Sequence, residues 1–273
     1  MFQLLETFIT VYETNNFTKA ANALYISQPT ISVHIEKLEK ELGVKLFERN
    51  RHNRISKTAA ADLFYQKAKQ ICNDWEKTKQ DLLAASGEAR RTFKIAASQT
   101  VGGYLLPQIL SNLQALHSDV DFELMLDNST NVYKTVHMLE ADIGLVESPE
   151  VYPDITRKVF MQDELVVIGD RHLTRWILRE PGSGIRQYTD EYFKNEEIIP
   201  AEQMMASSNA IILDLVKQGF GRSLQSKLAI AGISEPVQPT NLTRPLYLIT
   251  LDTATGNEEI TQDIFELLSG LDH

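Results

Sequence analysis

Cysteine and long apolar runs are both scarce in this chain. A single cysteine, Cys72, among 273 residues excludes an internal disulfide and a metal site built from several thiolates. No apolar run approaches the length that spans a bilayer. The first residues carry Glu6 and Glu13 and lack the basic start and uncharged apolar core of a secretory signal. We therefore expect a soluble, cytoplasmic protein.

The motifs of common enzyme classes are missing as well. The sequence has no His-Glu-x-x-His, no P-loop, no Gly-x-Gly-x-x-Gly and no Gly-x-Ser-x-Gly, and its six histidines are scattered. We predict that the protein is not an enzyme and holds no metal or cofactor. A catalytic cleft between two lobes stays open as an alternative, as does a structural nucleoid protein.

Charge is divided unevenly along the chain. The net charge is -10 at pH 7, but residues 1–91 hold 14 basic and 11 acidic side chains, whereas residues 92–273 hold 13 and 26. With 43% hydrophobic residues the chain is long enough for two or three folded units. This division predicts a basic head that binds nucleic acid and an acidic body that avoids non-specific adhesion.

Residues 16–54 have the pattern of a helix-turn-helix. A short helix with small inner residues precedes a turn at 25–27, and Ser27 and Pro29 suit the cap and first turn of a second helix. Gly43 would end that helix. Its core-facing stripe is predicted to consist of Ile31, Ile35, Leu38 and Leu42.

The opposite face of this second helix begins with small and hydrogen-bonding side chains, which suit a major groove. Residues 45–57 then hold five basic side chains and one acid, a density typical of phosphate contact. Residues 46–48 and 54–56 are predicted to pair as the strands of a wing. The residues predicted to contact DNA are Thr18, Gln28, Pro29, Thr30, Ser32, Val33, His34, Lys37, Arg49, Arg51 and Arg54.

A long helix is predicted from a cap at Thr58 to about residue 85. Apolar residues recur in it at spacings of three and four over three heptads, as in a helix that pairs with a second copy. The alternative is that the same seam packs on its own domain. Cys72 is interpreted as an inert packed thiol. The residues predicted to dimerise are Phe64, Ala68, Ile71, Trp75 and Leu82.

Strands and helices alternate after a polar boundary at residues 86–91. Strands are predicted at 92–97, 120–126, 143–146, 164–168, 176–178 and 245–251, with helices at 102–116, 131–140, 187–195, 210–218, 226–231 and 258–268. This order predicts an α/β unit with a parallel sheet and crossover helices.

Polar residues gather where predicted strands lead into helices, which is where open parallel sheets bind ligands. The segment 179–186 is the clearest of them, with two glycines, a serine and an arginine around a predicted helix start. A tight turn with a surface arginine, and simple helix caps at Ser98 and Thr100, are the alternatives. We predict a small carboxylate or other oxyanion at Ser98, Gln99, Thr100, Ser129, Thr130, Glu147, Ser183, Gly184, Arg186 and Asn209.

Several short motifs occur here in the order and spacing of one known family. Residues 16–21 (NFTKAA), 27–32 (SQPTIS), 38–39 (LE) and 42–49 (LGVKLFER) resemble the winged-helix signature of the LysR-type transcriptional regulators. Two departures are Val33, where the family often has a basic residue, and Ala61, where it usually has glycine. The match is strong in the head and weaker through the rest of the chain.

The resemblance implies a winged helix-turn-helix at 1–57, a dimerising linker helix and hinge at 58–91, and a two-lobed effector domain of the periplasmic-binding-protein type at 92–273. Lobe 1 would comprise 92–161 and 237–273, and lobe 2 would comprise 162–236. The connection at 169–175 is shorter than in relatives, so a helix of lobe 2 is expected to be trimmed. The implied partners are double-stranded DNA, a second copy in a homodimer, a dimer of dimers, and RNA polymerase.

Overall fold

The computed structural model describes residues 1–273 except 50–54, 87–89, 231–233, 253–256 and 272–273. The chain forms two compact units, residues 1–89 and 90–273. Each unit has its own core, and each is described by itself.

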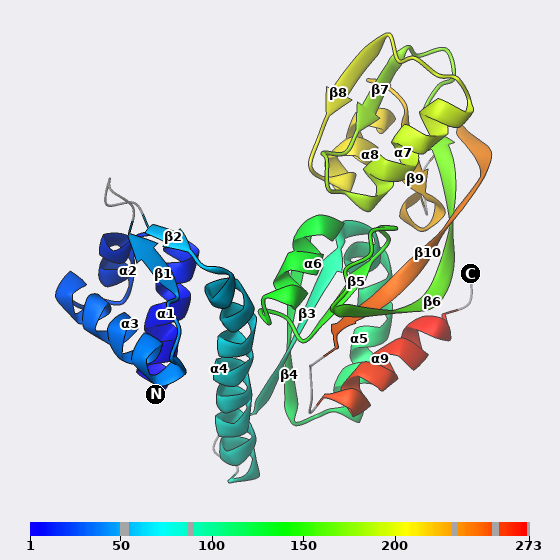
Figure 1. Cartoon of the computed structure of the whole chain (residues 1–273). Helices are drawn as coiled ribbons and strands as arrows, with labels where there is room; N and C mark the ends of the chain where they lie inside the picture. Colours follow the sequence, from blue (N-terminus) through cyan, green and yellow to red (C-terminus); the bar gives the residue numbers. More distant parts are fainter. Residues whose placement is uncertain (50–54, 87–89, 231–233, 253–256, 272–273) are drawn as a thin grey trace. The chain divides into compact units, whose positions relative to one another are not determined.

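Residues 1–89 form a winged helix-turn-helix followed by a long helix (Figure 1). The order is α1 (Phe2–Thr14), α2 (Phe17–Ala23), α3 (Gln28–Leu42), β1 (Phe47–Arg49), β2 (Ile55–Lys57) and α4 (Ala59–Ala85). The hairpin pairs Phe47 with Lys57, one residue later in each strand than predicted. Thr58 caps α4 as expected, because its hydroxyl accepts a hydrogen bond from the Ala61 amide at 3.1 Å.

Lobe 1 of the second unit contains parallel strands with helices on both faces. Its first elements are β3 (Arg91–Ser98), the π-helix η1 (Val101–Leu105), α5 (Leu106–Leu116), β4 (Val120–Asp127), α6 (Ser129–His137) and β5 (Ile143–Val146). Apolar side chains of α5 and of α9 (Glu258–Ser269) pack on one face of the sheet. Those of α6 pack on the other face.

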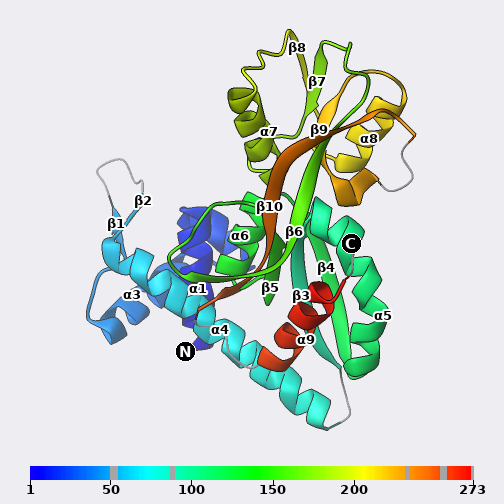
Figure 2. The same ribbon diagram turned by 90° about the vertical axis from the view of Figure 1, so that its right-hand side faces the viewer.

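Two long strands connect the lobes. β6 (Ile155–Ile168) and β10 (Val237–Leu251) pair in antiparallel fashion within a sheet of order β4-β3-β5-β10-β6-β9. Figure 2 shows them running side by side from one lobe into the other. The short strands predicted at 164–168 and 245–251 are therefore the ends of much longer ones. Proline lacks the N–H that a sheet ladder uses, so Pro236 and Pro239 disfavour a strand in the sequence, whereas Pro239 lies inside β10 opposite Val166.

Lobe 2 contains β7 (Arg175–Leu178), α7 (Gly184–Asn195), β8 (Glu202–Met205), α8 (Asn209–Lys217), β9 (Ser223–Ser226) and the 3-10 helix η2 (Lys227–Ile230). The helix predicted at 226–231 is wrong, since its first residue ends a strand and a 3-10 helix follows. β8 was not predicted, because residues 202–205 are mostly exposed. The connection at 169–174 contains no helix.

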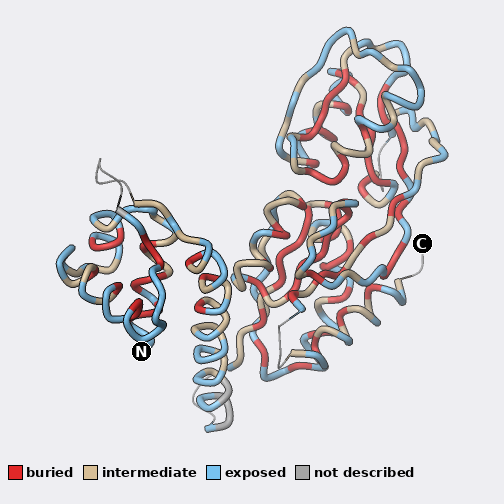
Figure 3. Tube along the Cα trace, in the orientation of Figure 1, coloured by how far each residue is buried: buried red, intermediate tan, exposed pale blue. Residues whose placement is uncertain are grey.

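Figure 3 shows the buried residues gathered inside each lobe. In lobe 2, α8 packs on one side of the strands and α7 on the other. No helix within the described part of the chain combines the length and apolar character needed to cross a membrane.

Candidate functional sites

The α3 helix buries one edge and exposes the other. Ser27 caps it by accepting a hydrogen bond from the Thr30 amide at 3.3 Å. Ile31, Ile35 and Leu38 are at most 3% exposed, so they fix which face meets the core. Val33, on the opposite side, is 59% exposed. This is the orientation that reading a groove requires.

The predicted stripe is wrong at its last residue, because Leu42 is 39% exposed. Leu42 ends the helix before Gly43, whose φ of 73° turns the chain away. Glu39 is buried instead. Its carboxylate accepts hydrogen bonds from the Leu46 and Phe47 amides at 2.9 and 3.2 Å and pairs with Lys45.

Burial alone would raise the pKa of Glu39, but the Lys45 ammonium and the two backbone amides outweigh it and hold the pKa below its usual value. This role of Glu39 was not among the sequence predictions. The signal was present, since an acid followed directly the last buried leucine of the stripe. Through these hydrogen bonds, Glu39 near the end of α3 holds the start of β1, the first strand of the wing, in place.

The remaining side chains predicted to contact DNA differ in their exposure and in whether they already hydrogen-bond within the protein. Gln28 donates to the Ser32 hydroxyl at 3.0 Å, and the Thr30 hydroxyl lies 2.8 Å from that of Ser27. Nδ1 of His34 lies 2.9 Å from the hydroxyl of buried Thr7, and its predicted contact with DNA stays a prediction. The exposed members of the predicted set are Thr18, Gln28, Pro29, Val33 and Lys37.

The wing is only partly described. Arg49 is the last residue of β1, and its side chain is not described. Arg51 and Arg54 lie outside the described residues. Their predicted phosphate contacts stay predictions.

The predicted seam of α4 divides into two halves. Phe64 packs on Phe8 with ring centroids 5.0 Å apart, and Ala68 has no exposed surface. Ala68 is therefore wrong as a dimer contact, because the same spacing of three and four also packs the first half of α4 on α1. Ile71 and Leu82 are 43% and 66% exposed.

Trp75 lies where the two halves meet. It is 44% exposed while its ring stacks on Phe2 at 4.8 Å. A groove of about 410 Å³ between α1 and α4 is lined by Trp75, Ile9 and Cys72, among others. Burial raises the pKa of the Cys72 thiol, and Glu6 and Glu76 raise it further, which disfavours a reactive thiolate.

Most of the residues predicted to bind an effector converge where the lobes meet. Ser98, Thr100, Ser129, Glu147, Ser183 and Asn209 are all at most 4% exposed. Ser98 caps the following helix, since its hydroxyl accepts from the Val101 amide at 3.4 Å. That contact supports the capping alternative for Ser98.

A fully buried arginine that the sequence did not single out organises this region. Arg244 lies on β10 with 0% exposure, and its Nε donates to Asp163 of β6 at 2.8 Å. One Nη donates to the Thr100 hydroxyl at 3.2 Å, and the other lies 3.5 Å from a Glu147 oxygen. The sequence did offer a signal for a buried role, because Arg244 directly precedes Pro245 and the apolar run 246–249.

Arg186, which was predicted to bind an anion, is held by two partners in the structure. Its guanidinium binds Asp190 one helical turn along α7 and the carbonyl of Arg179. In the loop between β7 and α7, the buried guanidinium is that of Arg179. It pairs with Glu180 at 2.8 Å and donates to the Asn209 side chain. Arg186 therefore has partners within its own lobe, and its predicted contact with an anion stays a prediction.

Hydrogen bonds between the lobes involve the same polar residues. Gln99 donates to the Ser207 carbonyl and accepts from the Asn209 amide, both at 2.8 Å. The Thr130 amide donates to the Gly182 carbonyl at 3.1 Å. Gly182 has a φ of +91° and a Cβ there would lie 3.2 Å from the Thr130 hydroxyl, so this loop needs glycine.

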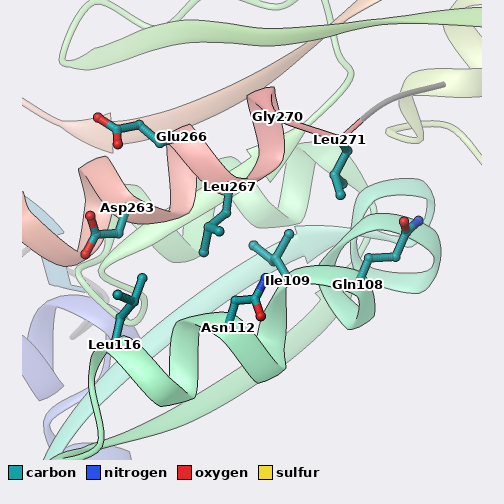
Figure 4. Close-up of a pocket in the computed structure, with 9 residues that line it drawn as sticks. All are labelled: Gln108, Ile109, Asn112, Leu116, Asp263, Glu266, Leu267, Gly270 and Leu271. Atoms are coloured by element: carbon teal, nitrogen blue, oxygen red, sulfur yellow. The ribbon is translucent and has the colours of Figure 1, made fainter.

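A groove of about 330 Å³ lies elsewhere, between α5 and α9 (Figure 4). Ile109, Leu116 and Leu267 line it together with Asp263 and Glu266. None of the residues predicted to bind the effector lines it. Within the described residues, no three side chains of His, Cys, Asp or Glu gather as metal ligands would.

Two family models match the chain. The model described as "Bacterial regulatory helix-turn-helix protein, lysR family" matches residues 2–62, and "LysR substrate binding domain" matches residues 86–262. The chain is 36% identical over 241 residues to the HTH-type transcriptional regulator CysL of Bacillus subtilis, covering 83% of this chain and 80% of the relative. It is 30% identical over 246 residues to an uncharacterized HTH-type regulator of Staphylococcus xylosus, covering 88% and 90%.

Solved structures share the fold at low identity. A full-length OxyR variant from Pseudomonas aeruginosa gives a TM-score of 0.67 at 18% identity over 100% of this chain and 98% of the other. CbnR, a LysR family regulator, gives 0.65 at 21% identity over the whole of both chains. CbnR complexed with its target DNA gives 0.64 at 20% identity over 98% of each.

Proposed function

Since the chain belongs to the LysR-type family of transcriptional regulators, and is a DNA-binding regulator with a substrate-binding domain, we propose how its parts divide that work. Residues 1–57 bind the duplex, 58–91 dimerise, and 92–273 bind the effector. Lobe 1 comprises 92–161 and 237–273, and lobe 2 comprises 162–236. The protein acts in the cytoplasm.

Sequence reading is assigned to the exposed face of α3. The observation that carries this is the exposure of Val33 opposite a buried edge of isoleucine and leucine. Val33 would contact a thymine methyl in the major groove, because its side chain has no donor for guanine. Arg49, Arg51 and Arg54 of the wing would bind phosphates.

Dimerisation is assigned to the second half of the α4 seam. Ile71, Trp75 and Leu82 supply exposed apolar surface, and Phe64 supports them from within the chain. A homodimer would place two heads on a pseudo-palindromic site. We extend this to a dimer of dimers, and to RNA polymerase as the partner through which DNA binding alters transcription.

Effector capture is assigned to the junction of the lobes. A small molecule with a carboxylate or similar oxyanion would bind beside Thr100, Ser129, Thr130 and Ser183. The support is that Thr100, Ser129 and Ser183 are buried and Thr130 is half-buried at the junction of the lobes, which the paired strands β6 and β10 connect.

The test is selection of genomic fragments of the source organism by the purified chain. We expect discrete sites with two-fold symmetry. Fragments enriched only by base composition would support a nucleoid protein, and the absence of any enrichment would support neither DNA-binding reading.

A further inference from the structure

Three polar atoms at the junction of the lobes are buried without a hydrogen-bond partner. They are Oε2 of Glu147, Nη1 of Arg244 and Oγ of Ser129. The three side chains are at most 2% exposed. Buried polar atoms in folded proteins are nearly always hydrogen-bonded, because leaving them unpaired is costly, so three unpaired atoms in one region indicate that a ligand supplies the missing partners.

The junction of the lobes holds one more buried or half-buried carboxylate than guanidinium group. Arg244 pairs with Asp163 at 2.8 Å, and Arg179 pairs with Glu180 at 2.8 Å. Glu147 is the remaining carboxylate, and its closest guanidinium nitrogen lies 3.5 Å away and already belongs to the Asp163 pair. A ligand that brings a positively charged donor to Oε2 of Glu147 would neutralise this buried charge.

Two of the unpaired atoms belong to side chains that meet, since Nη1 of Arg244 lies 3.5 Å from a Glu147 oxygen, and the loop 182–184 lies against the residues that carry or adjoin the others. A Cβ at Gly184 would lie 2.6 Å from Cγ of Glu147, and one at Gly182 would lie 3.2 Å from the hydroxyl of Thr130, next to Ser129. Two residues of chain span at most about 7 Å. The loop 182–184 therefore lies against both Glu147 and Thr130, the residue that follows Ser129.

We propose that the effector is an amino acid with free ammonium and carboxylate groups. Its ammonium group donates to Oε2 of Glu147, and its carboxylate accepts from Nη1 of Arg244 and from the Ser129 hydroxyl. The proposal rests on the effector site proposed above and refines its predicted oxyanion into a zwitterion.

The proposal is tested by thermal unfolding of the full chain with each proteinogenic amino acid, its N-acetyl derivative and its deaminated acid. At least one amino acid is expected to raise the unfolding temperature in a concentration-dependent manner, as a ligand of the folded state does. The matching N-acetyl and deaminated acids, which lack the ammonium group, should leave it unchanged. Equal stabilisation by either derivative, or none by any amino acid, overturns the proposal.

The role of Glu147 is tested by titrating the stabilising amino acid into variants. Glu147→Gln is expected to raise its Kd about tenfold or more, since a hydrogen bond to a charged group is lost. Glu147→Asp keeps the charge and should keep the preference for the amino acid over its N-acetyl derivative. Glu123→Gln, on the exposed part of β4, is the matched control. An unchanged Kd in Glu147→Gln overturns the assignment.

The experiments distinguish failure of the amino-acid proposal from failure of the proposed effector site between the lobes. A deaminated acid that stabilises the chain, and does so less in Ser129→Ala, would keep the site between the lobes and remove the ammonium group from it. If no small molecule in the three sets stabilises the chain, the amino-acid proposal fails, while the selection of DNA fragments still decides the regulator's DNA-binding role.

Discussion

Glu39 fixes the connection between α3 and β1 by accepting hydrogen bonds from two backbone amides. Glu39→Ala leaves the amides of Leu46 and Phe47 buried without acceptors, so the free energy of unfolding of residues 1–89 should fall by about 3 kcal/mol. Urea unfolding measures this loss. Glu39→Gln retains a carbonyl acceptor and should recover part of the stability. An Ala variant as stable as the parent would show that water replaces the carboxylate.

The same carboxylate gives the head a pH dependence. Because the pKa of Glu39 is lower in the folded state than the ordinary value of 4.5, its stabilisation is complete above about pH 4.5. It is lost as the pH falls through the lowered folded pKa. Stability curves of the parent and Glu39→Gln should therefore converge in acid, and parallel curves would contradict the assignment.

Arg49 belongs to the basic segment that we assign to phosphate contact. Arg49→Ala should weaken binding to every duplex and reduce the slope of log K against log salt by about 1. Val33→Ser should instead change preference at a base pair and leave the salt slope alone. Binding titrations at several salt concentrations separate the two. Lys134→Ala, exposed on α6, serves as the charge control.

At the scale of elements, the first half of α4 packs on α1, and the second half is the part that we propose dimerises. Its first half closes the core over Phe8, and its second half exposes Ile71 and Leu82. Ile71→Glu places a charge in the proposed seam and should yield monomers on a sizing column. Gln80→Glu, on the opposite side of the helix, should leave the oligomer intact. An intact oligomer in Ile71→Glu would place the dimer contact elsewhere.

β6 and β10 run through both lobes and therefore connect the residues of the proposed effector site. Asp163 and Arg244 face each other across these strands, so the charged pair lies at the crossing point. Both side chains are buried, and each charge is stabilised by the other and by neighbouring hydroxyls. The crossing strands therefore supply both the connection between the lobes and the centre of the proposed effector site.

At the scale of the whole molecule, a weakly basic head is joined to an acidic body. A single head with 14 basic and 11 acidic residues in the first 91 has little electrostatic affinity for DNA. Two heads joined through the proposed α4 seam would gain from the effective concentration of the second. A duplex with one half-site should therefore bind about a hundredfold more weakly than one with two. Competition assays measure the ratio, and in Ile71→Glu it should approach one.

The sequence by itself determined the head, because its signals are local. Caps, turn residues and the spacing of Ile31, Ile35 and Leu38 all act within a few residues of chain, and the family motifs lie in the same stretch. The predicted strand and helix order of residues 92–146 held for the same reason.

Only the tertiary structure decided which polar residues meet between the lobes. Arg244 and Asp163 pair across β10 and β6, and Arg179 reaches Asn209 from another element. No local pattern encodes a pairing between residues so far apart. It likewise took tertiary packing to divide α4, since a heptad spacing is the same whether the partner is α1 of the same chain or a second copy.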